Sequence, residues 1–297
     1  MSDAERPKMF DTSDRTASSP GTSRPALQRA RGVALAALSL RRGRTRLDGL
    51  RQQGCAKAFL PRESGDPEIV FLNTSGGLTG GDRLSYALTL GEGARVTATT
   101  QTAERAYTAP GAEAPARIDV RLEAGAGARL DWLPQETILY DGAALERQTG
   151  IALGRDAELL MCETLVLGRA AMGENVRRLR LFDRRSVTRD GRPVLVDAVE
   201  LTDGSLTAGA EEAGLAGARA VALVALIAPG AEDATQALRA LPLPEGVRGA
   251  VSGWDGKCVM RLMAGDSWPL RLALAATLRH LRARRGEPPA LPRVWQI

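Results

Sequence analysis

The segment RLSYALTLGEGARV, residues 83–96, returns 34 residues later as RIDVRLEAGAGARL, residues 117–130. In both copies every second residue is apolar: Leu84, Tyr86 and Leu88 match Ile118, Val120 and Leu122. A period of two is that of a strand with one buried face. Each copy then continues through Gly-x-Gly-Ala-Arg, a turn that leads into another strand. The two copies therefore predict a repeated unit of strand, turn and strand.

A weaker third copy follows 29 residues further on. In it Val120, Leu122, Gly125, Ala128 and Leu130 are replaced by Thr149, Ile151, Gly154, Ala157 and Leu159. Repetition of such a unit favours a stacked, solenoid-like β body, in which each unit covers the apolar face of its neighbour. Ordinary hairpins that share one kind of turn are the alternative.

The rest of the chain places further strands before the repeats and helices after them. Strand candidates lie at residues 33–40, 54–60, 68–72 and 218–228, and an Asp-Gly turn at residues 255–256 predicts a hairpin. Helices are predicted at residues 232–241 and along the apolar stripe of Leu270, Leu274, Leu278 and Leu281. We therefore expect a mainly β protein with two α-helices in its C-terminal third.

The domain prediction follows from these patterns. Residues 1–25 are polar, without a period, and are predicted to be a disordered tail. Residues 26–297 form the folded unit, with stacked strands over residues 26–210 and a β-α-β-β-α portion over residues 211–297. The longest apolar run, residues 220–228, is too short to cross a bilayer, and the start of the chain has no apolar secretory core.

Cysteine and histidine usage excludes several kinds of site. The three cysteines, Cys55, Cys162 and Cys258, are widely spaced, which is typical of free thiols in a cytoplasmic protein. The single histidine, His280, lies in an arginine-rich helical segment. A structural zinc cage needs four clustered Cys or His ligands, and a catalytic triad would have to use His280. Neither kind of site is expected.

The net charge of +5 raises the question of a nucleic-acid partner. Only three of the 40 basic residues are lysines, and aromatic residues make up 4% of the chain. This composition indicates GC-rich coding bias and offers few rings for base stacking. A solvated basic face, or one that meets an acidic protein, is the better interpretation.

A glycine-rich loop, NTSGGLTGGD at residues 73–82, follows the buried strand at residues 68–72. It lacks the Gly-Lys-Ser/Thr of a nucleotide-binding P-loop, and a strand rather than a helix follows it. A tight connection between strands is therefore favoured. The functional alternative is a loop whose Asp82 meets a partner or lines a channel.

Carboxylates are the remaining candidates for chemistry: Asp82, Glu104, Glu136, Asp141, Glu163 and Asp197. Paired acids can do general acid–base work or hold cations through oxygen. Single carboxylates among strands are more often solvated ends of a sheet. The residues alone thus indicate a β-rich protein without an obvious active site.

Five segments together resemble the urease accessory protein UreD family, called UreH in some lineages. They are residues 73–82, 99–107, 130–142, 163–174 and 291–295, in the family's order and spacing. The resemblance covers about residues 29–297. Its motif positions include Gly76, Gly77, Gly80, Gly81, Trp132, Pro134, Gln135, Gly168 and Arg169. Arg105 departs from the family because many members carry lysine there, which keeps the charge but alters its geometry.

The resemblance implies a non-catalytic, cytoplasmic scaffold in the maturation of nickel urease. Members bind apo-urease together with the accessory protein UreF and the GTPase UreG, and a passage for nickel through UreD has been proposed. The implied fold is a β-helix-like stack of strands with two helices. Neither nucleic acid nor a membrane is an expected partner.

The resemblance also gives the carboxylates a role. A conduit must bind its ion weakly, because a tight site would trap it. We therefore expect nickel only in transit, with no tightly bound cofactor. Our hypothesis is that Asp82, Glu104, Glu163 and Asp197 line the route, and the alternative is that they hold loops that dock UreF. A carboxylate-dependent enzyme and a basic nucleic-acid binder are the rival functions.

Overall fold

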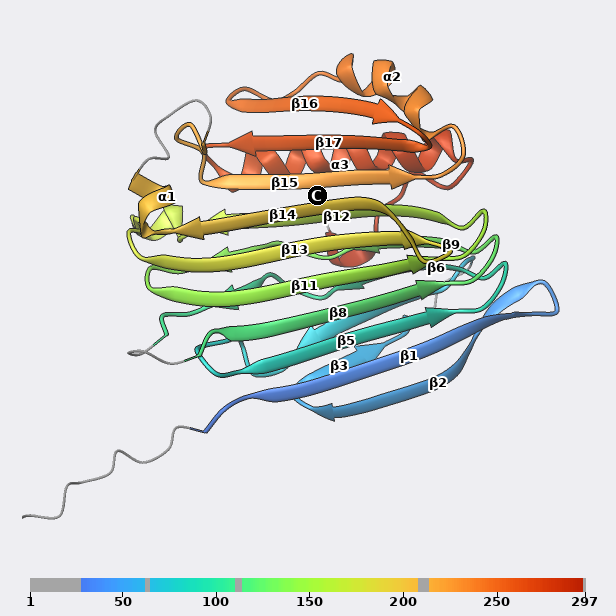
Figure 1. Ribbon diagram of the computed structural model, residues 1–297, viewed down its shortest axis with the longest axis horizontal. Coiled ribbons are helices and arrows are strands. Elements are labelled where there is room, and N and C mark those ends of the chain that lie inside the picture. Colours follow the sequence, from blue (N-terminus) through green and yellow to red (C-terminus); the bar gives the residue numbers. More distant parts are fainter. Residues whose placement is uncertain (1–27, 62–64, 110–113, 208–213, 296–297) are drawn as a thin grey trace, which may run out of the picture.

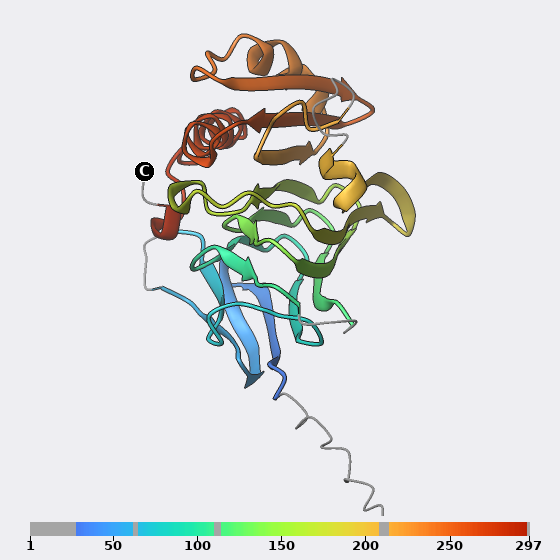
Figure 2. The ribbon, with the colours of Figure 1, turned by 90° about the vertical axis from the view of Figure 1, so that its left-hand side faces the viewer.

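The computed structural model describes residues 28–61, 65–109, 114–207 and 214–295 and contains two β-sheets that face each other (Figures 1 and 2). The predicted tail at residues 1–25 lies outside the described residues. The first sheet has seven strands, in the order β14-β13-β11-β8-β5-β1-β2. The second has ten, with the main order β16-β17-β15-β12-β9-β6-β4-β3 and the short strands β7 and β10 beside it.

The strands of the first sheet are β1 (Arg31–Arg41), β2 (Arg44–Gly54), β5 (Arg83–Leu90), β8 (Ala116–Ala124), β11 (Ala143–Leu153), β13 (Leu179–Arg189) and β14 (Arg192–Thr202). Those of the second are β3 (Ala56–Phe59), β4 (Glu68–Asn73), β6 (Arg95–Thr100), β7 (Glu104–Ala106), β9 (Arg129–Leu133), β10 (Thr137–Leu139), β12 (Glu158–Leu167), β15 (Ala220–Ile227), β16 (Val247–Trp254) and β17 (Lys257–Ala264). The α-helices are α1 (Asp203–Thr207), α2 (Thr235–Arg239) and α3 (Ser267–Arg284). Short 3-10 turns are Ala170–Met172, Ala231–Ala234 and Arg293–Trp295.

The sequence repeat fixes the register of the central strands. β5 and β8 pair in parallel with Leu84 opposite Ile118, the 34-residue offset of the repeat. The third copy keeps the register, because Thr149 lies opposite Val120. Between these pairings the chain visits the second sheet, so the repeated strands are not neighbours in a hairpin. The hairpin alternative is therefore wrong for these three copies.

The expectation of a mainly β protein is confirmed, but what the structure shows is two mixed sheets rather than a solenoid. Antiparallel pairs close both ends of the first sheet, β1 with β2 and β13 with β14. The second sheet continues from β12 through the antiparallel strands β15, β17 and β16. The division of the chain near residue 210 stays a prediction.

Both predicted C-terminal helices are present. The longer one, α3, begins after Asp266, whose side chain accepts a hydrogen bond from the backbone N–H of Trp268 at 2.7 Å. Its apolar stripe of Leu270, Leu274, Leu278 and Leu281 is buried against the second sheet. The five-residue helix α1 has no counterpart in the prediction. No helix among the described residues is long and apolar enough to cross a membrane.

Two apolar cores position the site. The larger core fills the space between the sheets, where the alternating residues of β5 and β8 are buried. The smaller core lies between α3 and strands β15–β17 of the second sheet. Near β13 and β14, charged side chains point into the space between the sheets, at positions where the neighbouring strands have apolar residues.

Candidate functional site

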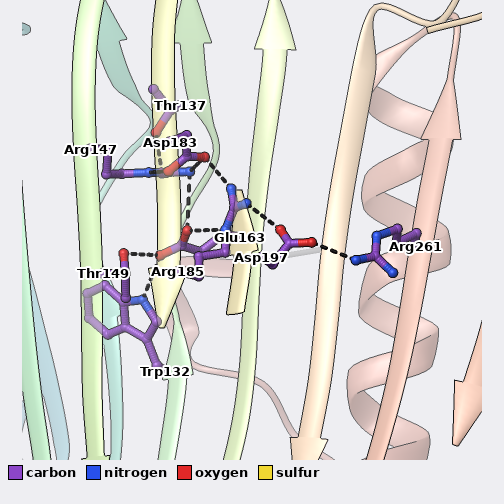
Figure 3. Close-up of polar contacts among 9 residues, drawn as sticks. All are labelled: Trp132, Thr137, Arg147, Thr149, Glu163, Asp183, Arg185, Asp197 and Arg261. Atoms are coloured by element: carbon purple, nitrogen blue, oxygen red, sulfur yellow. Dashed lines mark hydrogen bonds and ion pairs between the residues drawn. The ribbon is translucent and has the colours of Figure 1, made fainter. Parts of the chain in front are cut away.

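Six charged side chains form a continuous network between the two sheets (Figure 3). From the first sheet come Arg147 on β11, Asp183 and Arg185 on β13, and Asp197 on β14; from the second come Glu163 on β12 and Arg261 on β17. Residues i and i+2 of a strand point to the same face, so the inward series of β13 places both Asp183 and Arg185 in the core. The network therefore holds three carboxylates and three guanidinium groups.

Asp183 is the centre of the network. Its two oxygens accept hydrogen bonds from Nε and Nη2 of Arg147 at 2.8 and 2.6 Å, the fork geometry that arginine and carboxylate prefer. Nη2 of Arg185 also donates to Asp183. Asp183 is fully buried, and Arg147 and Arg185 are 5% and 2% exposed. Because these side chains are almost wholly buried, each charge depends on its partners.

Glu163 joins this unit to the second sheet. It accepts a hydrogen bond from Nε of Arg185 at 2.7 Å and lies 3.2 Å from Nη2 of Arg147. The Thr149 hydroxyl and the Trp132 indole N–H donate to its other oxygen at 2.7 and 3.3 Å. Burial acts to raise the pKa of Glu163, but the nearby arginines and the hydrogen bonds outweigh it and lower the pKa to about 2.

Asp197 lies at the outer end of the network. It accepts hydrogen bonds from Nη1 of Arg185 at 2.9 Å and from Nη2 of Arg261 at 2.6 Å. Arg185 thus links Asp197 to both Glu163 and Asp183. The Arg261 side chain is largely exposed, so this end of the network reaches solvent.

Glu104 lies in a separate environment, in a cavity of about 70 Å³ on the inner side of the network. Its only side-chain hydrogen bond among the described residues comes from the Asn73 amide, at 3.1 Å. Burial raises the pKa of Glu104 to about 7 and outweighs the Asn73 amide and the neighbouring Arg105, which act to lower it. The cavity is large enough for water and is lined by oxygen-bearing side chains that include Thr100, Gln135 and Thr137.

A second cavity of about 390 Å³ lies on the other side of the network, between β14 and strands β15–β17. Its walls are mainly apolar, with Leu165, Val199 and Leu223 among the lining residues. Asp197, Arg185 and Arg261 supply its charged part. Glu163 lines both cavities, so its carboxylate and the two arginines that hold it form the wall between them.

The inner cavity also gathers much of the motif set expected from the sequence: Gly76, Gly77, Glu104, Trp132, Pro134, Gln135 and Glu163. Of the four candidate carboxylates, Glu104, Glu163 and Asp197 line one cavity or both. Asp82 lines neither. Its oxygens accept backbone N–H bonds from Ala30 at 2.7 Å and Thr79 at 2.8 Å, which closes the turn that contains Gly80 and Gly81.

Gly77 shows why the loop at residues 73–82 requires glycine. Its φ is +147°, and a Cβ placed there would lie 2.4 Å from the Tyr107 ring and 2.8 Å from the Arg105 carbonyl oxygen. Only glycine accepts both the dihedral angle and the close approach. The Tyr107 hydroxyl donates to the Gly76 carbonyl oxygen at 3.0 Å, so this loop is fixed at the mouth of the inner cavity.

A stack of side chains continues from this loop along the same end of the sheets. The Tyr107 and Tyr140 rings meet edge to face at 4.9 Å, and the guanidinium of Arg169 lies 4.5 Å from the Tyr140 ring centre. Arg169 donates to Glu174 at 2.8 Å. Gly168, with a φ of +68°, turns the chain out of β12 into this stack. These contacts give Gly168 and Arg169 a place in the loop scaffold, away from both cavities.

The other residues singled out from the sequence lie outside the network. Glu136 pairs with Arg271 of α3 at 2.9 Å. Asp141 accepts two backbone N–H bonds, from Arg177 and Arg178, and these lower its pKa. All three cysteines are free, and Cys162 and Cys258 are buried. His280, on α3, lines neither cavity.

Sequence reasoning missed Arg147, Asp183, Arg185 and Arg261. A signal for three of them was present. The inward series of β11 runs Leu145, Arg147, Thr149, Ile151, and that of β13 runs Leu181, Asp183, Arg185, Val187. A charge in phase with an apolar series must be buried, and a buried charge needs a partner. Two such series in one chain indicate a buried ion pair between the strands that carry them.

The described part of the chain contains no group of three or more histidine, cysteine, aspartate or glutamate side chains arranged to hold a metal ion. The network carboxylates are already held by arginines, and Glu104 lies alone. The described residues offer isolated oxygen ligands and do not build a coordination sphere.

Comparison with known proteins identifies a family that matches this sequence. The family described as UreD urease accessory protein matches residues 30–296. A urease accessory protein UreD of Cereibacter sphaeroides (strain ATCC 17025) is 55% identical over 92% of this chain and 97% of its own length. The UreD of Paracoccus denitrificans is 50% identical over 91% and 94%. The UreD of Rhizobium leguminosarum bv. viciae is 42% identical over 91% and 96%.

Proposed function

Because this chain belongs to the UreD urease accessory protein family, we propose that nickel passes through it along the two cavities that meet at Glu163. The protein is a non-catalytic accessory protein that takes part in urease maturation and nickel insertion. Because the chain belongs to this family, urease maturation is favoured over the two rival functions, an enzyme and a nucleic-acid binder. The proposal concerns how nickel is handled.

The observation that carries the proposal is the position of Glu163. It is the one candidate carboxylate that lines both cavities, and the inner cavity reaches the glycine loop while the second reaches exposed Arg261. A route from the glycine loop to Arg261 would therefore cross one charged barrier, the wall that contains Glu163. Movement of the Arg185 side chain from Glu163 to Asp197, which it already contacts, would open that wall.

The charge balance of the wall supports transit rather than storage. Three arginines neutralise three carboxylates, so no net negative charge remains to trap a divalent cation. Glu104, with a pKa of about 7, is only partly ionised near neutral pH and has no neighbouring acid in its cavity to form a chelate except Glu163. Weak, hydrated, oxygen-assisted passage fits these features.

The candidate residues then take different roles. Glu104 is proposed to receive the ion in the inner cavity, Glu163 to pass it across the wall, and Asp197 to release it into the second cavity. Asp82 supports the route indirectly, since its oxygens accept the backbone N–H of Thr79 in the glycine loop and that of Ala30, just before β1. Nickel is cargo in this scheme, and no tightly bound cofactor is part of it.

Family membership implies partners in the urease maturation complex. We propose that these are UreF, UreG and the apo-urease subunits, and that the complex works in the cytoplasm. Three free cysteines, two of them buried, fit that compartment. Nucleic acid and membrane are not part of the proposal.

The experiment is co-expression of the cognate urease subunits and accessory proteins with and without this chain, reading nickel per urease active site and urea hydrolysis. We expect both to fall to background when the chain is omitted and to return when it is restored. Fully loaded urease without the chain would contradict the proposed function. If the other accessory proteins still form a complex without the chain, the loss of urease activity is due to nickel delivery and not to complex assembly.

A further inference from the structure

Strand β2 is an uncovered edge of the first sheet. It is the last strand in the sheet order and, within the part of the chain that the structure describes, pairs only with β1. Every residue from Arg44 to Gly54 is exposed except Thr45. In Figure 1 the β1–β2 hairpin projects past the neighbouring strands at one side of the body. An exposed edge strand of this length offers a row of backbone groups for pairing with another chain.

The two faces of β2 differ in chemistry. Leu47 and Leu50 lie opposite the buried residues Leu38 and Ala36 of β1, so they point to the core side of the sheet. They are nevertheless 41% and 39% exposed, because no strand of the second sheet covers them fully. The core side of β2 is therefore an apolar margin open to solvent.

The opposite face of β2 carries Arg44, Arg46 and Arg51. None of these three guanidinium groups has an ion pair among the described residues. The hairpin from Arg31 to Gly54 contains six arginines and a single acid, Asp48, which pairs with Arg41 at 2.5 Å. Positive charge thus accumulates along one face of the edge while leucines line the other.

The hairpin is held in a defined shape. Arg42 and Gly43 both have positive φ, 52° and 75°, as in the tight turns that match the twist of a hairpin. At the inner end, the Gln52 side chain exchanges two hydrogen bonds with the backbone of Ala58, at 3.1 and 3.3 Å. The edge is therefore ordered before any partner arrives, which limits the entropy lost on binding.

We propose that β2 binds an extended segment of a partner protein by strand addition, and that this segment alternates acidic and apolar residues. Strand addition supplies backbone hydrogen bonds, and the alternating side chains supply specificity. β2 has a bulge at which β1 leaves Asp48 unpaired. A segment that skips Asp48 in the same way would place its acids opposite Arg44, Arg46 and Arg51 and its apolar residues opposite Leu47 and Leu50. A second copy of this chain does not fit, because pairing of two β2 strands would bring arginines together across the new ladder.

This inference goes beyond the nickel route and depends on the proposed function only for the choice of proteins to test. The first test uses the purified chain alone. The probe is the peptide EVEVEVEVE with blocked ends, measured at low ionic strength by fluorescence anisotropy or calorimetry. Two further peptides are the controls: the same composition in blocks, EEEEEVVVV, and EVEVEVEVE with every amide N-methylated.

The matched protein variants change the same amount of charge at two places on one sheet. The test variant carries Arg44→Glu, Arg46→Glu and Arg51→Glu. The control variant carries Arg121→Glu, Arg184→Glu and Arg192→Glu, which are also exposed on the first sheet but lie away from β2. Because all six side chains are exposed, both variants are expected to fold.

We expect the alternating peptide to bind the wild-type chain and the control variant equally and the test variant at least tenfold more weakly. Both control peptides should bind at least tenfold more weakly than their parent. In co-purification with UreF, UreG and apo-urease, the test variant should lose one partner that the control variant keeps. Equal weakening in both variants, or tight binding of the N-methylated peptide, would overturn strand addition at β2.

Two other outcomes would also overturn the proposal. Retention of every partner by the test variant would show that β2 docks none of them. A dimer of the wild-type chain that becomes a monomer in the test variant would identify a second copy as the occupant. Failure of nickel delivery alone would appear in urease loading and would leave the peptide result unaffected.

Discussion

Replacing Asp183 with asparagine is expected to lower the free energy of unfolding by about 3–5 kcal/mol. The change keeps the size of the side chain but removes the charge that holds Arg147 and Arg185, both of which are buried. Removing one partner of a buried pair leaves uncompensated charge, and this costs more than the pair itself contributes. Urea unfolding of the purified chain at pH 7 measures the loss.

The matched control is Asp119→Asn on β8 of the same sheet. Asp119 is half-buried and lies on the face opposite the core, where water compensates the lost charge. We expect a change of less than about 0.5 kcal/mol there. A similar small change for Asp183→Asn would contradict the claim that the buried charges of the network depend on one another.

Replacing Glu104 with glutamine is expected to stabilise the protein and impair its function. Glutamine keeps an acceptor for the Asn73 amide and removes a carboxylate that burial makes unfavourable in its charged form. The folded-state pKa of about 7 lies above the ordinary value of 4.5. Between these values the folded state binds a proton that the unfolded state has released, so the free energy of unfolding falls as pH rises from about 4.5 to about 7.

The variant should lack that fall. At pH 8 we expect its free energy of unfolding to exceed that of the wild type by about 2 kcal/mol, a value reduced from the full pKa difference because Glu104 is not wholly shielded from water. Below pH 4.5 the two proteins should be equally stable. Unfolding curves at several pH values measure this, with the exposed Glu200→Gln on β14 as the control.

The same variant tests function. If Glu104 receives nickel, urease matured with the glutamine variant should contain several-fold less nickel at a fixed time, while the accessory complex still co-purifies. Delivery by the wild type should rise with pH through about 7, because ionised Glu104 is the better cation ligand. If the glutamine variant is more stable than the wild type and urease still receives the same amount of nickel, Glu104 has no role in nickel transit.

The order and register of the central strands could be predicted from the sequence, because repetition is a local signal. A pattern that returns after 34 residues with the same phase needs no knowledge of the fold, and Leu84 pairs with Ile118 as the repeat implies. The amphipathic helix α3 was predictable for the same reason. In each case the periodicity reflects one buried face.

Features fixed by distant partners were not predictable in this way. β2 lacks the alternating apolar pattern because it is an edge strand whose residues remain exposed, so nothing marks it as a strand. The inward series of β13 marks Arg185 as buried, but its pairing with Glu163 and Asp197 could not be predicted, because these partners come from two other strands. The network follows from which strands become neighbours, and only the assembled sheets determine that.

The most direct test of the nickel route blocks the second cavity without touching a charge. Ala250 on β16 lines that cavity from its exposed rim, and Ala250→Trp would fill part of its volume of about 390 Å³. Ser252→Trp is the control, since Ser252 lies two residues further along the same face of β16 and does not line the cavity.

The measurement is nickel per urease active site after maturation with each variant, in preparations where the accessory complex co-purifies intact. The proposed route predicts that Ala250→Trp leaves urease largely without nickel, whereas Ser252→Trp loads it as the wild-type protein does. Full nickel loading with Ala250→Trp would contradict passage through the second cavity.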